Sequence, residues 1–178
     1  LDIQLDWLVS EDSEIQCMDP NFGSIHNVED LPLLIIGTPI FKRVEVSKVF
    51  LKYMVDYFLP QMRWEGYNPY LLLVGSEEDQ SKLKHMFNEY VVYVQKENYL
   101  GTKKNTILNI AKNSDADFLM WIDSDDFFHP KTASSLIDMS KYNGYWSAIE
   151  DFSFYNTQNQ RFTYFSGYDS KHNLSEWG

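Results

Sequence analysis

Four short apolar runs, each followed by a helical pattern, constrain the fold of this chain more than any other feature. The runs are unbroken rather than alternating, which is typical of strands covered on both faces, as in a parallel sheet. They occupy residues 31–37, 70–75, 91–94 and 118–122. The repeated alternation of strand and helix predicts an α/β fold with a doubly wound, mostly parallel sheet.

The segments after these runs repeat apolar residues at helical spacing. The first predicted helix has its inner face over residues 46–58 and ends at Pro60, because proline disrupts a helix interior. Ser76 is placed to cap the second helix, whose first turn is acidic. A polar loop over residues 95–101 is expected to lead into the third helix, and Pro130 suits the first turn of the fourth.

The two ends of the chain differ from this pattern. Residues 145–155 and 161–168 are aromatic and β-prone, with a polar segment between them, which predicts antiparallel strands near the C-terminus. Residues 1–30 contain eight acidic residues and no Lys or Arg. We expect an acidic N-terminal extension that docks on the domain or on a protein partner, ahead of one domain over residues 31–178.

Charge and cysteine content exclude several classes of protein. A net charge of −11 disfavours binding to a phosphate backbone, so nucleic acid is not an expected partner. No apolar run approaches the roughly 18–20 residues of a membrane span. Cys17 is the only cysteine, which fits a reducing compartment, and we expect a cytoplasmic location. The chain begins at Leu1 rather than Met, so a fragment or a processed chain is expected.

Three carboxylates follow the fourth apolar run. Asp123, Asp125 and Asp126 stand at the carboxyl end of that predicted strand, where α/β sheets bind their ligands. In an apolar setting these carboxylates would repel one another and take up protons. A hard divalent cation, Mn²⁺ or Mg²⁺, prefers such oxygen ligands and removes the conflict. The alternative is a solvated acidic turn at the start of the next helix.

Other polar residues are predicted at the same edge of the sheet. Thr38 follows the first strand, Ser76 follows the second, and residues 98–104 follow the third. Since the carboxyl ends of parallel strands meet at one edge, we expect these segments and the acidic turn to form one site.

Three segments, residues 33–39, 98–105 and 115–130, together resemble the family 2 type of glycosyltransferase, which has the A-type (nucleotide-diphospho-sugar transferase) fold. The most specific is the last, D-A-D-F-L-M-W-I-D-S-D-D-F-F-H-P. The resemblance spans about residues 31–140, most of the chain.

This resemblance implies a nucleoside-diphosphate sugar as the donor, bound through its diphosphate to Mn²⁺ or Mg²⁺. Asp125 would be the principal metal ligand, with Asp123 nearer the ribose and Asp126 assisting. The metal would act as a Lewis acid on the leaving diphosphate. The acceptor would be a glycan, a protein or a lipid. The residues expected to bind the nucleotide sugar are Thr38, Pro39, Ser76, Asn98, Gly101, Lys103, Lys104 and Asp123. Lys103 and Lys104 fit solvated surface lysines equally well.

Two departures from the family pattern bear on this interpretation. The family commonly ends its second strand with an Asp pair that contacts the base, whereas this chain has Val74-Gly75-Ser76. The family's general base usually lies well after the metal motif, but this chain ends 52 residues after Asp126. Asp151 is the predicted catalytic base, and a domain that lacks part of its acceptor half fits as well.

Two other functions remain open. A shortened transferase domain could serve as a non-catalytic binding or assembly module. A phosphatase of the haloacid dehalogenase type would use Asp123 as its nucleophile. In that class the motif usually opens the domain, whereas here about 90 residues of predicted α/β structure come first, and Phe127 stands where Thr or Val is expected.

Overall fold

The computed structural model describes residues 31–96, 99–143, 147–148, 151–156 and 161–166. The chain divides into two compact units, of which the first ends at Lys131 and the second begins at Thr132. The predicted acidic extension of residues 1–30 lies outside the described residues.

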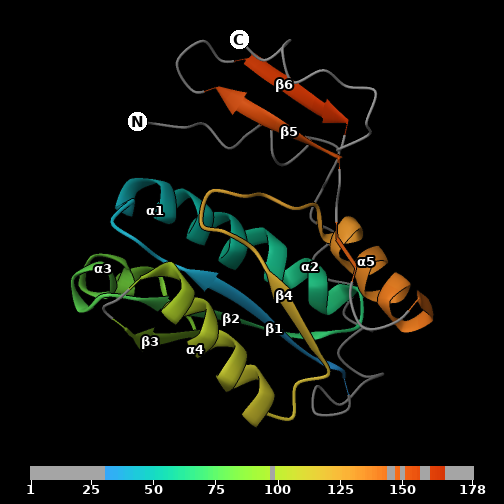
Figure 1. The fold of residues 1–178 in the computed structure, drawn as a ribbon, viewed down its shortest axis with the longest axis horizontal. Helices are drawn as coiled ribbons and strands as arrows, with labels where there is room; N and C mark the ends of the chain where they lie inside the picture. The colour runs from blue at the N-terminus through green and yellow to red at the C-terminus, as the bar shows by residue number, and fades with distance from the viewer. Residues whose placement is uncertain (1–30, 97–98, 144–146, 149–150, 157–160, 167–178) are drawn as a thin grey trace. The chain divides into compact units, whose positions relative to one another are not determined.

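The first unit contains a parallel sheet of four strands (Figure 1). The strands are β1 (Leu33–Pro39), β2 (Asn68–Gly75), β3 (Val91–Gln95) and β4 (Phe118–Trp121), and their order is β3-β2-β1-β4. Every neighbouring pair is parallel. This confirms the predicted α/β class and its parallel sheet, an arrangement compatible with a Rossmann-like fold. The central strands β1 and β2 are almost entirely buried, as their unbroken apolar sequence predicts.

The first helical segment passes through Pro60, so the prediction that it ends there is wrong. It consists of α1 (Val44–Tyr53), the π-helical turn η3 (Met54–Phe58) and α2 (Leu59–Trp64). The proline stands at the start of α2, directly after the wider turn. Proline lacks the N–H that an α-helix requires, and a local change in winding lets the helix continue past it.

The remaining helices differ from the predictions mainly at their ends. Helix α3 (Glu77–Leu83) begins after Ser76 as expected, because the Ser76 hydroxyl accepts a hydrogen bond of 3.0 Å from the Asp79 N–H. A 3₁₀ turn, η4 (Lys84–Met86), then ends the segment. Helix α4 (Leu100–Asn113) begins inside the predicted polar loop, and α5 (Pro130–Asn143) begins at its proline.

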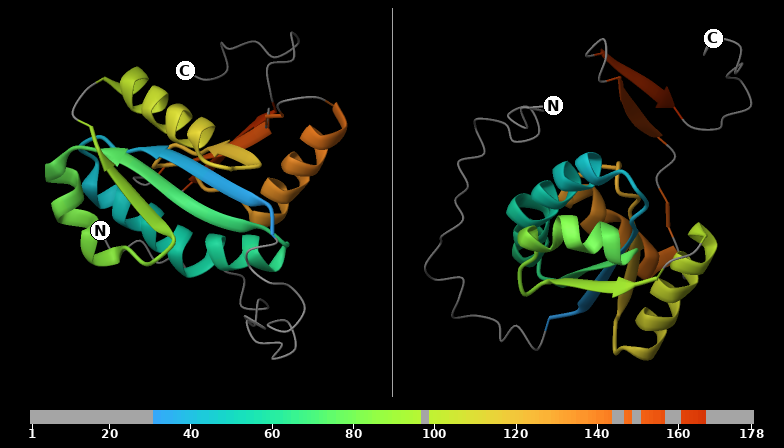
Figure 2. Two further views of the ribbon diagram at one scale, coloured as in Figure 1. Left: turned by 90° about the horizontal axis from the view of Figure 1, so that it is seen from below. Right: turned by 90° about the vertical axis from the view of Figure 1, so that its left-hand side faces the viewer.

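Helices cover both faces of the sheet. Figures 1 and 2 show α4 on one face and α1, α2 and α3 on the other. Ile107 and Ala111 of α4 pack in one buried cluster with Ile35, Leu72 and Val74. The approach of α4 is close at Gly37, where an added Cβ would overlap Cγ2 of Ile107. Only glycine fits at that position without a shift of the helix.

The opposite face of the sheet carries the larger apolar side chains. Successive residues of a strand point to opposite faces, so Leu34 and Ile36 lie on this side. The fully buried side chains contributed by the long first helical segment are Phe50, Leu51, Met54, Phe58, Leu59 and Met62. They fix the position of α1 and α2 under β1 and β2 through burial of apolar surface.

The second unit contains two antiparallel strands, β5 (Asp151–Asn156) and β6 (Arg161–Ser166). Asp151 pairs with Ser166 at one end and Asn156 pairs with Arg161 at the other.

Candidate functional site

The strand order places a change of direction between β1 and β4. From β1 the chain proceeds through β2 to β3 on one side, and it then crosses to β4 on the other side of β1. In open α/β sheets, ligands bind where the carboxyl ends of two such strands diverge. The segments that leave this point are residues 40–43 after β1 and Asp123–Asp126 after β4. The acidic turn thus lies at the carboxyl end of β4, beside the end of β1.

The acidic turn is anchored to β1 and closed on itself. The Ile122 N–H donates to the carbonyl oxygen of Gly37 over 3.2 Å, and the Asp126 N–H donates to that of Asp123 over 3.0 Å. Ser124 is buried within the turn. The backbone of the turn is consequently held in place, while the carboxylates before and after Ser124 face outward.

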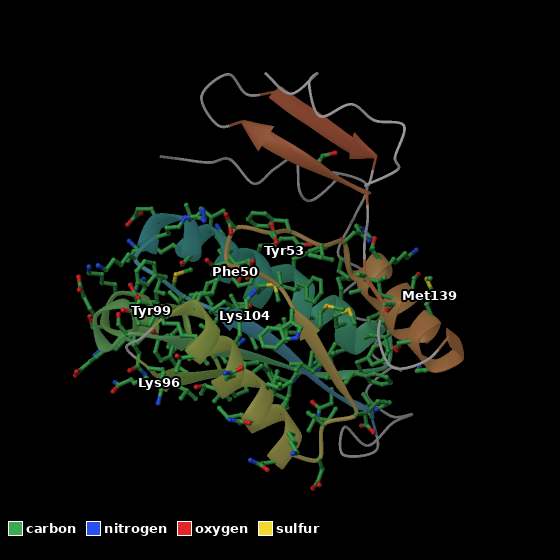
Figure 3. All side chains as sticks on the ribbon, in the orientation of Figure 1. Phe50, Tyr53, Lys96, Tyr99, Lys104 and Met139 are labelled. Carbon is green, nitrogen blue, oxygen red and sulfur yellow. The ribbon has the colours of Figure 1, made fainter. Side chains whose placement is uncertain are left out.

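Aromatic packing against Phe50 and Tyr53 of α1, both labelled in Figure 3, fixes the residues that follow the turn. The Phe127 ring packs edge-on against Tyr53, at 5.3 Å between centroids, and against Phe50, at 6.4 Å. The Tyr53 hydroxyl donates to the Phe128 carbonyl oxygen over 2.6 Å. Helix α1 thus holds the far end of the segment that begins at β4. The sequence analysis did not predict this contact.

Two of the three carboxylates are paired with basic side chains. Both terminal nitrogens of Arg43 donate to Oδ2 of Asp125, at 2.6 and 2.7 Å. Lys104 lies 3.9 Å from Oδ1 of Asp123. The side chains of the Arg43–Asp125 pair are 54% and 43% exposed, so solvent screens the attraction and either partner can be exchanged at low cost.

The third carboxylate, that of Asp126, lies near the negative charges of Asp123 and Asp125. Burial raises the pKa of Asp126, the charges of Asp125 and Asp123 raise it further, and the Arg43 guanidinium opposes the shift. Asp126 remains exposed at the surface, and after burial the two neighbouring carboxylates are the next largest causes of the raised pKa. Repulsion of this kind is relieved when a cation binds.

The arrangement fits a metal ion that is coordinated partly by protein carboxylates and partly by the phosphates of a bound molecule. Within the described ranges, no three or more His, Cys, Asp or Glu side chains converge on one point as a complete metal site would require. Mg²⁺ and similar cations are commonly held by one or two carboxylates together with substrate phosphates and water. Asp125 and Asp123 could supply such ligands, because each is paired with a basic side chain that remains partly exposed to solvent.

Lys103 and Lys104 have different environments, which the sequence could not separate. Both lie in the first turns of α4 and not in a loop. Lys103 is 2% exposed, and its Nζ donates to the Ile40 carbonyl oxygen over 2.5 Å. Lys104, labelled in Figure 3, is partly exposed. Its ammonium group lies beside Asp123 and over the Trp121 ring. Of the two, Lys104 is the one placed at the acidic turn.

Lys103 takes part in holding the loop after β1. Burial lowers the pKa of Lys103, and the negative charge of Asp79 opposes that shift. Asp79, on α3, is itself buried, and its carboxylate accepts a hydrogen bond of 2.8 Å from the Ser76 hydroxyl and a long one of 3.5 Å from the Lys42 N–H. Lys42 has a φ of 54°, a conformation that non-glycine residues rarely adopt. The two buried charges therefore fix a strained loop that ends at Arg43.

The other predicted nucleotide-binding residues are distributed as follows. Thr38 and Pro39 are the last residues of β1, not a turn after it. Thr38 is fully buried, and its Oγ1 has no hydrogen-bond partner among the described residues. Ser76 is engaged as the cap of α3. Gly101 lies in the first turn of α4 with open space around it. Asn98 and the side chain of Asp151 lie outside what the structure describes.

Sequence reasoning missed Arg43 and Asp79. Asp79 follows Ser76 by three residues, the spacing of a helix-capping pair, and this signal could have indicated its role. Arg43 had no such signal, because its contact with Asp125 joins positions 82 residues apart.

Comparison with models of known protein families and with curated proteins gives no match to this sequence. In the part of the chain that the structure describes, no helix is long and apolar enough to cross a membrane.

Proposed function

We propose that this chain is the donor-binding domain of a metal-dependent glycosyltransferase that uses a nucleoside-diphosphate sugar. The observation that carries the proposal is the acidic turn Asp123–Asp126, which lies where the strand order reverses at the carboxyl edge of a parallel sheet. The finer fold assignment, to the nucleotide-diphospho-sugar transferase type, rests on this turn and on the resemblance of residues 115–130 to family 2 glycosyltransferases.

The chemistry of the turn supports a phosphate-bearing ligand. A bound divalent cation would stabilise the negative charge on the leaving diphosphate. Asp125 and Asp123 would hold that cation, and Asp126 would add negative charge beside it. Lys104 stands next to Asp123 and could neutralise a phosphate once the cation takes the carboxylate. The backbone of the turn is already held by β1, so little ordering is required on binding.

Calorimetry with UDP and GDP, each with and without Mn²⁺, tests the proposal. We expect binding that requires Mn²⁺ and that falls at least tenfold in Asp125→Ala, because the cation loses its principal ligand. The matched control is Glu78→Ala, which removes a carboxylate from an exposed pair with Lys82 on the surface of α3. Equal affinity in the presence and absence of Mn²⁺, or equal losses in both variants, would reject the metal-bridged site.

A further inference from the structure

In a site proposed to bind a cation, the carboxylate of Asp125 is already occupied by a positively charged side chain, that of Arg43. The guanidinium places two of its nitrogens on a single carboxylate oxygen, Oδ2, at 2.6 and 2.7 Å. In the free protein the carboxylate best placed to bind a metal thus already has a positive partner. A divalent cation bound to that carboxylate would lie beside the Arg43 guanidinium, and the repulsion between the two positive charges makes them compete for Asp125.

The backbone at Arg43 is fixed, but its side chain is not buried. The preceding loop is held by the hydrogen bond from Lys103 to Ile40 and by Asp79 beside Lys42. The Arg43 side chain is 54% exposed, which leaves space on its solvent side for a change of rotamer. A guanidinium displaced from Asp125 therefore stays within one side-chain length of the acidic turn.

We propose that Arg43 exchanges partners when the donor binds. In the free protein it neutralises Asp125, and when a divalent cation arrives with a nucleoside diphosphate, the cation takes Asp125 and Arg43 binds a phosphate oxygen. A guanidinium suits both partners, since its planar set of donors binds carboxylates and phosphates alike. This inference rests on the proposed function, because it concerns the same metal and the same diphosphate.

The exchange makes metal and nucleotide binding cooperative. A cation that arrives alone must displace Arg43, which then has no anionic partner. A cation that arrives with a diphosphate supplies that partner. Neutralising Arg43 should therefore have opposite effects on the two ligands, tighter binding of the metal alone and weaker binding of the metal–nucleotide pair.

The experiment measures the affinity of Mn²⁺ alone and of UDP and GDP in saturating Mn²⁺, in the wild type and in Arg43→Met. We expect Mn²⁺ alone to bind about three- to tenfold more tightly in the variant, as for removal of one charge beside a partly exposed site. The nucleotide should bind about tenfold more weakly, since a charged hydrogen bond to phosphate is lost. Free Mn²⁺ can be followed by electron paramagnetic resonance, and thermal unfolding checks that the variant is folded.

Lys48→Met is the matched control, because Lys48 lies on α1 and pairs with Glu45 rather than with a carboxylate of the acidic turn. It removes the same charge and should change neither affinity by more than about twofold. Arg43→Lys keeps the charge without the planar donors and should restore most of the competition with Mn²⁺.

The outcomes separate the inference from the proposed function. Unchanged or weaker binding of Mn²⁺ alone in Arg43→Met overturns the competition, as does the absence of Mn²⁺ binding in both proteins. Unchanged nucleotide affinity in Arg43→Met, with metal-dependent binding in the wild type, overturns the transfer to phosphate and leaves the proposed function standing. If the wild type and Lys48→Met bind neither nucleotide, the proposed function fails and the phosphate contact with it, while the measurements with Mn²⁺ alone still decide the competition.

Discussion

The ammonium group of Lys103 in α4 donates a hydrogen bond of 2.5 Å to the backbone carbonyl oxygen of Ile40, which lies 63 positions away in the loop after β1. The lysine is almost completely buried, and Asp79 is the buried carboxylate whose charge acts on it. Burial of an ammonium is unfavourable unless it is paired and hydrogen-bonded. The contact therefore joins α4 to the loop that leads to Arg43.

Replacing Lys103 by Met should destabilise the fold. The variant leaves the Ile40 carbonyl without this donor and removes the positive charge near Asp79, which together should cost about 2–4 kcal/mol. For a chain of this size the thermal midpoint should fall by roughly 5–12 °C. Lys104→Met, at the neighbouring exposed position, should shift the midpoint by less than about 2 °C. Similar midpoints for the two variants would contradict the buried role of Lys103.

Gly37→Ala should also destabilise, for a steric reason. The added Cβ would overlap Cγ2 of Ile107 and force α4 away from β1, at a cost of about 1–3 kcal/mol. Gly101→Ala is the control, because open space surrounds that glycine in the first turn of α4 and alanine favours helix. Denaturant unfolding of both variants should show loss of stability at Gly37 and none at Gly101. A neutral Gly37→Ala would show that α4 does not approach the strand this closely.

The raised pKa values of two tyrosines lead us to expect a loss of stability at alkaline pH. Burial raises the pKa of Tyr53, helped by the nearby Tyr57. Burial and then Asp79 raise the pKa of Tyr93, against a backbone hydrogen bond at Gln80 that lowers it. In the unfolded chain these phenols ionise near pH 10, whereas in the folded protein their raised pKa values keep them protonated to a higher pH. Their contribution is therefore complete below pH 10 and is lost as the pH rises above it.

The measurement for this prediction is the free energy of unfolding of the wild type, Tyr53→Phe and Tyr93→Phe between pH 8 and 11. Each variant should be less stable than the wild type at pH 8, because a partly buried hydrogen bond to a carbonyl is lost. Between pH 10 and 11, each should lose about 1 kcal/mol less than the wild type. Equal losses in all three proteins would show that these phenols ionise normally.

Turnover separates an enzyme from a binding module. Asp151 remains the predicted general base, and the structure places its backbone at the start of β5. Loss of a general base lowers the rate by about 10²–10⁴, so Asp151→Asn should slow transfer or donor hydrolysis by that factor. Nucleotide binding in Mn²⁺ should be unchanged. Unaltered turnover would remove Asp151 from the mechanism, and no turnover in the wild type would favour the non-catalytic module.

The strands and helix starts could be predicted because each is determined by residues close together in the sequence. The apolar runs that became β1 and β2 needed cover on both faces, and Ser76 caps α3 by accepting a hydrogen bond from Asp79, only three residues away. The prediction of a helix end at Pro60 failed because the effect of a proline depends on how the preceding turn is wound. A π-helical turn there lets the helix continue.

The position of the acidic turn was predictable from the sequence, but its partners were not. A strand followed by three carboxylates indicates the ligand edge of an α/β sheet. Which bases stand opposite them depends on long-range placement, as the contacts of Arg43 and Lys104 show. The same holds for Lys103, which is adjacent to Lys104 in sequence yet points into the protein because α4 begins at Leu100.

The position of β4 beside β1 has a consequence for biosynthesis. Leu34 pairs with Phe118, so one long edge of β1 stays open while the ribosome adds the intervening residues. Until then a nascent chain can assemble β1, β2 and β3, but it presents a free apolar strand edge of the kind that pairs with other chains. Addition of β4 closes that edge and carries the acidic turn to the site in the same step. A chain interrupted before Trp121 would consequently lack the acidic turn and be prone to aggregation.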